Sequence, residues 1–488
     1  ALPAAQVYTA VAEQFRKLGA KNFLFETLSS DAGILEAVRT LKAAEPDTFV
    51  LVSFAVLPDG YTREGLYCKD LVRRMSESGC VDAVGLNCVS APGAMRTLAR
   101  SLSSALPLSV MPNAGYPVVT RTQVRYQGKP EYFAQELSGL AADGVVRILG
   151  GCCGTTPAHI AALRAALDAL PETAAPARTK EFSTPEAKPV ENEDAFLCKL
   201  NAGEKVIAIE LDSPRNADLT AYLEGARKLQ AAGADLLTIA DCPIAQARMD
   251  SSLVACRVHR ELGMCTLPHM TCRDRNLNAT KALLLGLYAE GVREVLASTG
   301  DPIPTAERDE VKNVYQFNSR KLAQYIVSLA GEGREMPSAM TVFGALNLNA
   351  RNFEVELRRA GEKLEHGMSG FLTQPVLSGQ AVENLRHARE VLGSRARILA
   401  GIMPVVSQRN AVFMENEING IHVEEDIIRQ FAGLDRAQGE ELGLAISLKM
   451  AREALPYADG FYLMTPFNRV ALMERLIARL RTEVLQES

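Results

Sequence analysis

Short apolar runs alternate with amphipathic stretches along the second part of the chain, from about residue 200 onward. Each run ends in a polar residue or in Gly or Pro, which is typical of a buried parallel strand, and the stretches between them carry the helical period. Eight such pairs in succession predict a (β/α)₈ barrel. The eight runs are 206–212, 236–241, 265–272, 292–298, 341–347, 370–376, 397–405 and 460–467.

A doubly wound open sheet is the alternative for a chain in which strands and helices alternate. That fold normally has fewer strands, and a G-x-G-x-x-G turn follows its first strand. No such turn follows the run at 206–212. The pattern therefore favours the closed barrel.

The first part of the chain repeats this alternation with fewer strands. A helical pattern up to Ala20 precedes the first run, and five parallel strands cannot close a barrel of this kind. We expect these strands to be the last five units of a barrel that lacks about three N-terminal βα units. The predicted fold class is thus α/β, with two TIM-type barrels in tandem and the first incomplete. The five runs are 23–27, 49–56, 83–88, 108–115 and 145–153.

A segment rich in Pro, Ala, Thr and charged residues separates the two parts. It spans residues 171–193, PETAAPARTKEFSTPEAKPVENE, and carries no apolar period. This composition is typical of an exposed linker. We therefore predict one domain over residues 1–170 and a second over residues 194–488.

The composition is that of a soluble globular protein, with 47% hydrophobic and 23% charged residues in 488. The sequence has no run of about 18 apolar residues, so we expect no membrane-spanning helix. The formal net charge is −5, the signs are well mixed, and no block of Lys and Arg indicates binding to nucleic acid or to a membrane. Ten cysteines in so long a chain favour a cytoplasmic protein with free or metal-bound thiols over a disulfide scaffold.

Three cysteines stand at predicted strand ends in the first part, where barrel enzymes place their chemistry. Cys88 ends the run VGLNC, and Cys152 and Cys153 follow the run that ends in GGCC. Neighbouring side chains of a strand point to opposite faces, but the flanking glycines allow the backbone to break and the two thiols to converge. Three thiolates with a fourth position open suit a catalytic zinc ion. The alternative is that each is a small buried core residue, as free cysteines often are.

The motifs VGLNC and GGCCGTTPAHI resemble those of the zinc-dependent homocysteine S-methyltransferase family, over residues 1 to about 170. The resemblance implies that Cys88, Cys152 and Cys153 bind zinc, and that Glu26 in FLFET helps hold the amino group of homocysteine. The Gly-rich opening strand of that family has no counterpart here. An alternative is therefore that this part is a non-catalytic docking or dimerisation module beside a working enzyme.

Polar residues also stand at the predicted strand ends of the second part. Glu210 lies in the apolar run VIAIELD, where desolvation should raise its pKa toward that of a useful general acid. Asp301 lies on a glycine turn in STGDP, and Gln374 in FLTQPV offers a donor and an acceptor to a heterocyclic ring. Each could instead be a barrel-rim group satisfied within the protein. Several such groups at one rim favour a site.

Six motifs in this part resemble methylenetetrahydrofolate reductase, across residues 200 to about 480. The two parts in tandem are similar to bacterial bifunctional proteins that join this reductase to a homocysteine S-methyltransferase. The likeness implies a bound FAD that NAD(P)H reduces and that in turn reduces 5,10-methylenetetrahydrofolate to 5-methyltetrahydrofolate. The motifs are IELDSPR, PHMTCRDRN, STGDP, FLTQPV, GIMPVVS and YLMTPFNR.

This resemblance also implies roles for single residues. Glu210 would be the general acid that opens the folate ring, Asp301 the acid beside flavin and pterin, and Gln374 the amide that contacts folate or nicotinamide. The chain departs from the family in having STGD where many reductases have RGD, and in lacking an aromatic residue near Gln408. The residues implied to bind FAD are His269, Thr271, Thr299, Gly300, Asp301 and Lys363.

The expected partners are small molecules, namely folate, homocysteine and nicotinamide substrates. An incomplete barrel would expose two sheet edges that must be covered, so a homo-oligomer is a further expectation.

Overall fold

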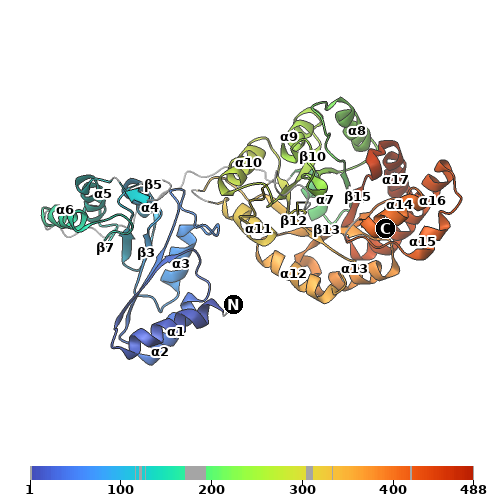
Figure 1. Ribbon diagram of the computed structural model, residues 1–488. Helices are drawn as coiled ribbons and strands as arrows, with labels where there is room; N and C mark the ends of the chain where they lie inside the picture. The colour runs from blue at the N-terminus through green and yellow to red at the C-terminus, as the bar shows by residue number, and fades with distance from the viewer. Residues whose placement is uncertain are drawn as a thin grey trace. The chain divides into compact units, whose positions relative to one another are not determined.

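The computed structural model describes residues 3–115, 117–119, 124–126, 128–170, 194–303, 312–331, 334–417 and 420–486. The chain divides into two units, Ala1–Glu186 and Ala187–Ser488 (Figure 1). The predicted linker, residues 171–193, lies outside the described residues. No helix in the described ranges is long and apolar enough to cross a bilayer.

The second unit contains a closed barrel of parallel strands (Figure 1). Consecutive strands are neighbours, and the last strand pairs with the first, Gly460 with Val206 and Met464 with Glu210. Every strand falls in one of the predicted runs, so the predicted (β/α)₈ barrel is confirmed for this unit. The strands are β8 (Val206–Glu210), β9 (Leu236–Ile239), β10 (Cys265–Thr271), β11 (Glu294–Ser298), β12 (Thr341–Leu346), β13 (Gly370–Pro375), β14 (Arg397–Ile402) and β15 (Gly460–Met464).

Helices surround this barrel on the outside (Figure 1). The connection between β14 and β15 carries three of them, α14, α15 and α16. The helices that follow the strands are α8 (Thr220–Ala231), α9 (Ser251–Leu262), α10 (Leu277–Ala289), α11 (Ser319–Ser328), α12 (Phe353–Glu365), α13 (Gly379–Leu392), α14 (Gln408–Glu417), α15 (Glu425–Gln430), α16 (Arg436–Ala454) and α17 (Val470–Glu483).

A short helix, α7 (Ala195–Asn201), closes the N-terminal end of the barrel. Asp194 caps it by accepting hydrogen bonds from the backbone N–H groups of the second and third residues after it. Phe196 packs into the same hydrophobic cluster as residues that begin the strands, and its ring centroid lies 6.3 Å from that of Phe343. Barrel enzymes bind their ligands at the other end, where the strands have their C-termini.

The inward-facing residues change from apolar to polar along strands β8 and β10. Alternate residues of a strand share a face, so Val206, Ala208 and Glu210 all point inward from β8. On β10 the same rule directs Leu267 and His269 inward. The apolar layers bury the middle of the barrel, and the polar layer collects at the C-terminal ends of the strands.

The first unit is built on an open parallel sheet of five strands in the order β1-β2-β3-β4-β7. The structure therefore shows the predicted strands but no barrel in this unit, because the sheet does not close on itself. Five βα units are too few to bring the first and last strands together. The strands are β1 (Asn22–Leu28), β2 (Phe49–Phe54), β3 (Ala83–Asn87), β4 (Leu108–Met111) and β7 (Ile148–Leu149).

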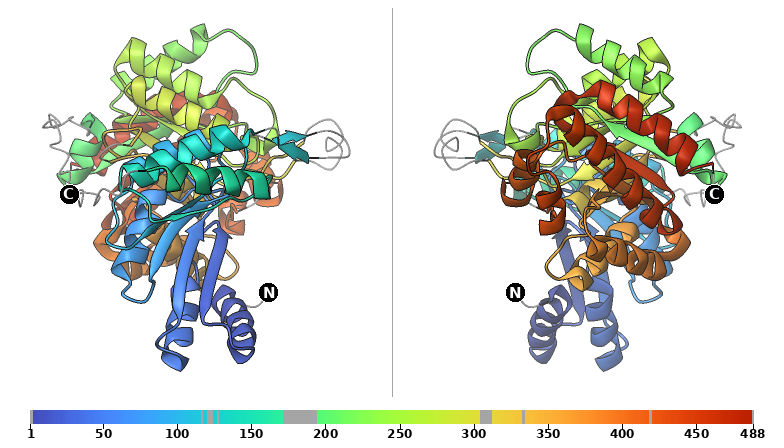
Figure 2. Two further views of the ribbon diagram at one scale, coloured as in Figure 1. Left: turned by 90° about the vertical axis from the view of Figure 1, so that its left-hand side faces the viewer. Right: turned by 90° about the vertical axis from the view of Figure 1, so that its right-hand side faces the viewer.

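The helices of the first unit follow the predicted alternation. The leading helix ends at Lys17, close to the predicted end at Ala20, and lies beside α2 (Figure 2). It exposes an apolar row that includes Val7, Val11 and Phe15. The helices are α1 (Ala4–Lys17), α2 (Ile34–Ala44), α3 (Cys68–Glu77), α4 (Pro92–Ser101), α5 (Pro130–Ala142) and α6 (Pro157–Asp168).

One element of the first unit was not predicted. An antiparallel hairpin of β5 (Pro117–Val119) and β6 (Val124–Tyr126) projects from the connection between β4 and α5 (Figure 2). Its strands are only three residues long, too short for an alternating pattern to stand out.

Glu294 generates a prediction about the stability of the barrel. This first residue of β11 is fully buried, and neither carboxyl oxygen has a hydrogen-bond partner among the described residues. Burial, together with the negative charge of Asp194, raises the pKa of Glu294 well above its ordinary value. The folded protein therefore holds a proton that the unfolded chain releases above about pH 4.3, so this group makes the free energy of unfolding fall as pH rises, by about 1.4 kcal/mol per pH unit.

We expect Glu294→Gln, which needs no proton, to unfold at a higher urea concentration than wild type at pH 8. The difference should shrink as the pH approaches about 4.3, where the unfolded glutamate is itself half protonated. Urea unfolding curves of both proteins at pH 5 and pH 8 measure this. An equal stability difference at both pH values would show that Glu294 is ionised in the folded barrel.

Candidate active site and metal centre

A cavity of about 630 Å³ opens at the C-terminal ends of the barrel strands. Parallel strands direct their last inward side chains to this end, which is where barrel enzymes bind their ligands. Apolar side chains form part of the wall, among them Leu296 of β11, Leu372 of β13 and Met403, which directly follows β14. The predicted site residues that line the cavity are Glu210, His269, Thr271, Gly300, Asp301 and Gln374.

Two predicted site residues do not line this cavity. Thr299 is exposed on the surface beside it. Lys363 lies on α12, behind the barrel wall, where its Nζ donates a hydrogen bond of 2.6 Å to the carbonyl of Ala345. Burial there lowers the pKa of Lys363. The structure therefore brings neither side chain to the cavity wall, and their contact with a cofactor stays a prediction.

Glu210 lies at the floor of the cavity, and 21% of its side chain is exposed. The Tyr462 hydroxyl, from the neighbouring strand β15, donates a hydrogen bond to Glu210 Oε2. Burial raises the pKa of Glu210 to about 7, although this hydrogen bond partly opposes the rise. An acid whose pKa lies near neutrality can both give and regain a proton, as a general acid must.

His269 stands across from this acid on β10. Its Nε2 is 3.9 Å from Glu210 Oε2 and has no hydrogen-bond partner in the described part of the chain. Burial lowers the pKa of His269 to about 4, so the imidazole is neutral at physiological pH. A buried polar atom beside a cavity that the protein does not satisfy favours a ligand contact at this point.

Asp241 connects the ends of β9 and β10. Its Oδ2 accepts hydrogen bonds from the backbone N and the hydroxyl of Thr271, both 3.0 Å, and from Arg275 at 2.6 Å. Arg275 also binds Asp250, the capping residue of α9, at 2.7 Å. Burial by itself would raise the pKa of Asp241, but Arg275 and Thr271 outweigh that effect and the pKa is lowered. The hydroxyl of Thr271 is thus engaged within the protein.

The turn after β11 requires a glycine. Gly300 has a φ of +91°, and a Cβ at this position would lie 2.9 Å from Cβ of Thr271. The buried Arg273 holds the same turn by donating a 3.2 Å hydrogen bond to the carbonyl of Asp301. The backbone can therefore approach the cavity closely here, while the Asp301 side chain stays exposed at the rim.

Two aromatic side chains at the cavity rim were not predicted. Phe413 on α14 and Phe467 after β15 both line the cavity and are 46% and 69% exposed. Phe467 and the next residue adopt left-handed backbone conformations, with φ of 50° and 54°. Such conformations cost about 1 kcal/mol or more in non-glycine residues. The fold therefore holds an apolar ring at the mouth of the cavity against a conformational cost.

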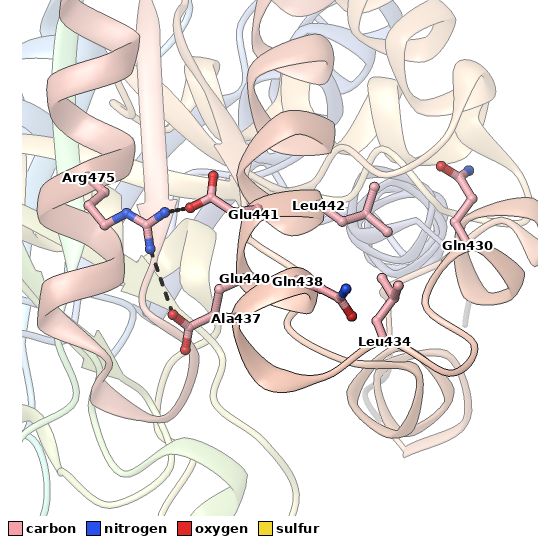
Figure 3. Close-up of a pocket in the computed structure, with 8 residues that line it drawn as sticks. All are labelled: Gln430, Leu434, Ala437, Gln438, Glu440, Glu441, Leu442 and Arg475. Carbon is pink, nitrogen blue, oxygen red and sulfur yellow. Dashed lines mark ion pairs between the residues drawn. The ribbon is translucent and has the colours of Figure 1, made fainter.

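A second hollow, of about 670 Å³, lies on the outside of the barrel between α15, α16 and α17 (Figure 3). Its charged groups pair with one another, since Arg475 contacts Glu441 and lies 3.8 Å from Glu440. No strand end reaches it. The barrel mouth is the better candidate for an active site.

The first unit brings its three predicted metal ligands together. The Sγ atoms of Cys88, Cys152 and Cys153 all lie within 4.8 Å of one another, and those of Cys88 and Cys153 are 3.6 Å apart. This is the only group of three or more potential metal ligands within the described ranges. Sulfur atoms of a tetrahedral zinc site are separated by about 3.8 Å, so the spacing fits such an ion after a small adjustment.

Broken strand geometry creates this cluster. The strand β7 ends at Leu149, before the two adjacent cysteines, and Cys88 has a φ of 55°. Backbone hydrogen bonds from Cys88 N to Met111 O and from Cys152 N to Pro112 O tie the strand ends together. Burial raises the pKa of the Cys152 thiol to about 12, and the nearby Cys88 thiol adds to the rise. A divalent cation would reverse this effect, because it stabilises thiolates.

Asn87 connects the thiols to Glu26. Its Nδ2 is 3.9 Å from Cys152 Sγ, 2.9 Å from Thr27 Oγ1 and 3.4 Å from Glu26 Oε2. Its Oδ1 accepts a hydrogen bond of 2.9 Å from Thr27 N. Glu26, the residue predicted to contact homocysteine, therefore lies beside the three cysteines that are predicted to bind the metal. Sequence reasoning missed Asn87, although it directly precedes Cys88.

A buried acid that titrates near neutrality, at the mouth of a closed (β/α)₈ barrel, is typical of a TIM-barrel enzyme. The family model for methylenetetrahydrofolate reductase matches residues 196–481, and the family model for homocysteine S-methyltransferase matches residues 3–167. The chain belongs to the methylenetetrahydrofolate reductase family. Both resemblances inferred from the sequence are confirmed, and both families are families of enzymes, as predicted.

Individual relatives match part of the chain. Methionine synthase of Mycobacterium tuberculosis is 45% identical over 89 residues, 18% of this chain and 8% of the relative. Homocysteine S-methyltransferase of Escherichia coli is 33% identical over 150 residues, 30% of this chain and 48% of the relative. The chain thus spans less than half the length of these curated relatives.

Among solved structures, an uncharacterized protein from Clostridium thermocellum that binds two copies of 5-methyl-5,6,7,8-tetrahydrofolic acid aligns with 58% of this chain and 98% of its own. The sequence identity is 13% and the TM-score 0.43, which is too low to establish a shared fold.

The Asp241 network generates a prediction about the site's framework. Asp241→Asn should destabilise the second unit by about 3 kcal/mol, because it removes the buried counter-ion of Arg275 and leaves that charge only the more exposed Asp250 as a partner. Urea unfolding measures this. The control is Glu224→Gln, which breaks exposed ion pairs of 3.2 and 3.5 Å on α8 and should change stability by less than about 0.5 kcal/mol. Equal effects of the two substitutions would contradict the structural role of Asp241.

Proposed function

We propose that the second unit binds FAD and catalyses the NAD(P)H-dependent reduction of 5,10-methylenetetrahydrofolate to 5-methyltetrahydrofolate. The observation that carries this proposal is Glu210, an acid with a pKa near 7 at the floor of a cavity in a barrel of the methylenetetrahydrofolate reductase family. The chemistry requires proton donation to the folate while hydride is delivered. Glu210 is buried enough to hold that proton at neutral pH.

The cavity fits a flat, partly polar ring system. The carbon wall of Leu296, Leu372 and Met403 suits a ring face, and the unsatisfied Nε2 of His269 suits a polar ring edge. The missing Cβ at Gly300 lets the backbone approach. We propose that His269, Thr271, Gly300 and Asp301 hold FAD, with Thr299 and Lys363 as outer contacts. When bound, FAD supplies the hydride chemistry, and the protein orients the reactants.

The proposed role of Glu210 is to donate its proton to a nitrogen of the five-membered folate ring, so that the ring opens. Gln374, which lines the same cavity, would orient the folate or the nicotinamide through its amide. Because its pKa is lowered to about 4, His269 stays neutral and adds no positive charge that would lower the pKa of Glu210. These roles divide the work between proton transfer and orientation.

Glu210→Gln tests the reductase proposal. The purified protein should be yellow, and NADH should bleach the flavin in wild type and variant alike, whereas reoxidation by methylenetetrahydrofolate should fall at least about 100-fold in the variant. Stopped-flow absorbance of the flavin measures each half-reaction. Glu294→Gln, a buried carboxyl at the opposite end of the barrel, is the matched control and should keep both half-reactions. A colourless protein that takes up no FAD, or loss of both half-reactions in Glu210→Gln, would contradict the proposal.

We further propose that Cys88, Cys152 and Cys153 bind zinc and that this unit methylates homocysteine to methionine, with Glu26 holding the substrate amino group. The convergence of three thiols with one ligand position open supports this proposal. Zinc, when bound, keeps the thiols deprotonated and lowers the pKa of a substrate thiol. Ten cysteines in a chain of 488 residues are typical of free or metal-bound thiols and not of a disulfide scaffold, and a cytoplasmic location is part of the same proposal.

Metal analysis of Cys152→Ser tests the zinc site. Wild type should contain about one zinc ion per chain, and the variant should lose most of it because a hydroxyl is a far poorer zinc ligand than a thiolate. Cys80→Ser, which changes a free cysteine outside the cluster, should retain zinc. Wild-type protein that binds no zinc and does not methylate homocysteine would favour the alternative of a non-catalytic docking or dimerisation module.

A further inference from the structure

The Tyr462 hydroxyl is the only described protein group that makes a side-chain hydrogen bond to the Glu210 carboxyl. Tyr462 is 7% exposed and belongs to the inner hydrophobic cluster of the barrel. Burial and the nearby negative charge of Glu210 raise the pKa of Tyr462 well above its ordinary value, so the phenol keeps its proton. The bond therefore has a fixed direction, with Tyr462 as donor and Glu210 Oε2 as acceptor.

We propose that Tyr462 is the positioning residue of the reductase, holding Glu210 through Oε2 so that the transferable proton sits on Oε1. This inference rests on the proposed reductase function. An oxygen that accepts a hydrogen bond from a phenol is the poorer place for the carboxyl's own proton, so the free oxygen carries it. Proton transfer breaks the O–H bond at Oε1 and forms an N–H bond on the folate ring. The ring C–N bond then breaks, its electron pair stays on that nitrogen, and the negative charge stays on the carboxylate.

Tyr462 also stabilises the charge that this step leaves behind. A hydrogen bond to an ionised carboxylate is about twice as strong as one to a neutral group, so the bond from Tyr462 strengthens as the proton leaves. The other groups that act on this acid and its donor are Asp212, Arg248, Tyr222, His269 and Thr238, which lowers the pKa of Tyr462. Among these, His269 is neutral at physiological pH, and the Tyr222 hydroxyl donates to the carbonyl of Leu211. Tyr462 is therefore the group that adjusts the acidity of Glu210 by direct contact.

The sign of the pH effect follows from this contact. A donor to the carboxylate lowers the pKa of Glu210, so removing it raises that pKa further above its ordinary value. Folate reduction needs the protonated acid and declines as the pH passes the pKa. Without the Tyr462 hydroxyl the decline should begin at higher pH, by about one pH unit. Below the decline the rate should be lower, because a weaker acid gives up its proton less readily.

Tyr462→Phe tests the inference on the full chain with FAD bound. The rate constant for flavin reoxidation by methylenetetrahydrofolate should fall about 3- to 10-fold at pH 6. In the pH profile of this rate constant, the decline at alkaline pH (the alkaline limb) should shift to higher pH by about one unit. Flavin reduction by NADH should be unchanged. Tyr222→Phe removes a buried tyrosine hydroxyl that donates to a backbone carbonyl, and it should leave the limb in place. If the alkaline limb of Tyr462→Phe lies at the same pH as that of wild type, the inference is overturned. A purely structural role of Tyr462 would change the rate constant without shifting this limb.

Two further measurements keep the test independent of folding and of activity. Site-specific 3-fluorotyrosine at position 462 keeps the ring and strengthens the donor, so the limb should move to lower pH. Carbon-13 NMR of protein labelled at the glutamate carboxyl carbons follows Glu210 directly, with its signal assigned by its loss in Glu210→Gln. The midpoint of the pH titration of this signal should be near 7 in wild type and higher in Tyr462→Phe. Unchanged midpoints would overturn the inference, whereas a shifted midpoint in a protein that does not reduce folate would refute only the proposed function.

Discussion

Closure of the barrel between β15 and β8 is the constraint on which the second unit depends. Met464 pairs with Glu210 and Tyr462 with Ala208, so the last strand of the chain supplies a wall beside the first. Tyr462 and Glu210 are 252 positions apart in the sequence, yet closure places the phenol on the carboxyl. Since alternate residues of both strands point inward, this pairing also determines which face of each strand reaches the cavity. A slip of one residue would direct Glu210 into the surrounding helices.

The first unit reaches a comparable result without a closed barrel. Parallel strands in sequential order place their C-terminal ends at one edge, and the thiols gather there because the backbone leaves the regular strand geometry just before them. The left-handed conformation of Cys88 and the hydrogen bonds to Met111 and Pro112 set the positions of the sulfur atoms. The cluster of three thiols therefore depends on irregular backbone at strand ends, whereas the position of Glu210 depends on strand register.

The strands could be predicted from the sequence because each is a short apolar run with a polar end, a signal contained within a few residues. Glu210 and the three cysteines could be predicted for the same reason, since each belongs to a local motif. Tyr462, Asp241 and Asn87 could not be assigned their contacts, because each acts through a partner from another strand. The antiparallel strands β5 and β6 were not predicted, because three residues are too few to show a period. Lys363 shows that a residue near a strand end in sequence can still lie behind the barrel wall.

Glu210 and Glu294 show why a raised pKa alone does not mark a functional acid. Both carboxyls point into the barrel, and burial raises the pKa of each. Glu294 lies at the closed end beneath α7, without a hydrogen-bond donor or a cavity, so its proton has no path to a ligand. Glu210 lies at the open end, where one oxygen is held by Tyr462 and the carboxyl borders a space large enough for a ring system. Burial favours a protonated carboxyl at both sites, but only the open end combines a hydrogen-bonded carboxyl with a cavity.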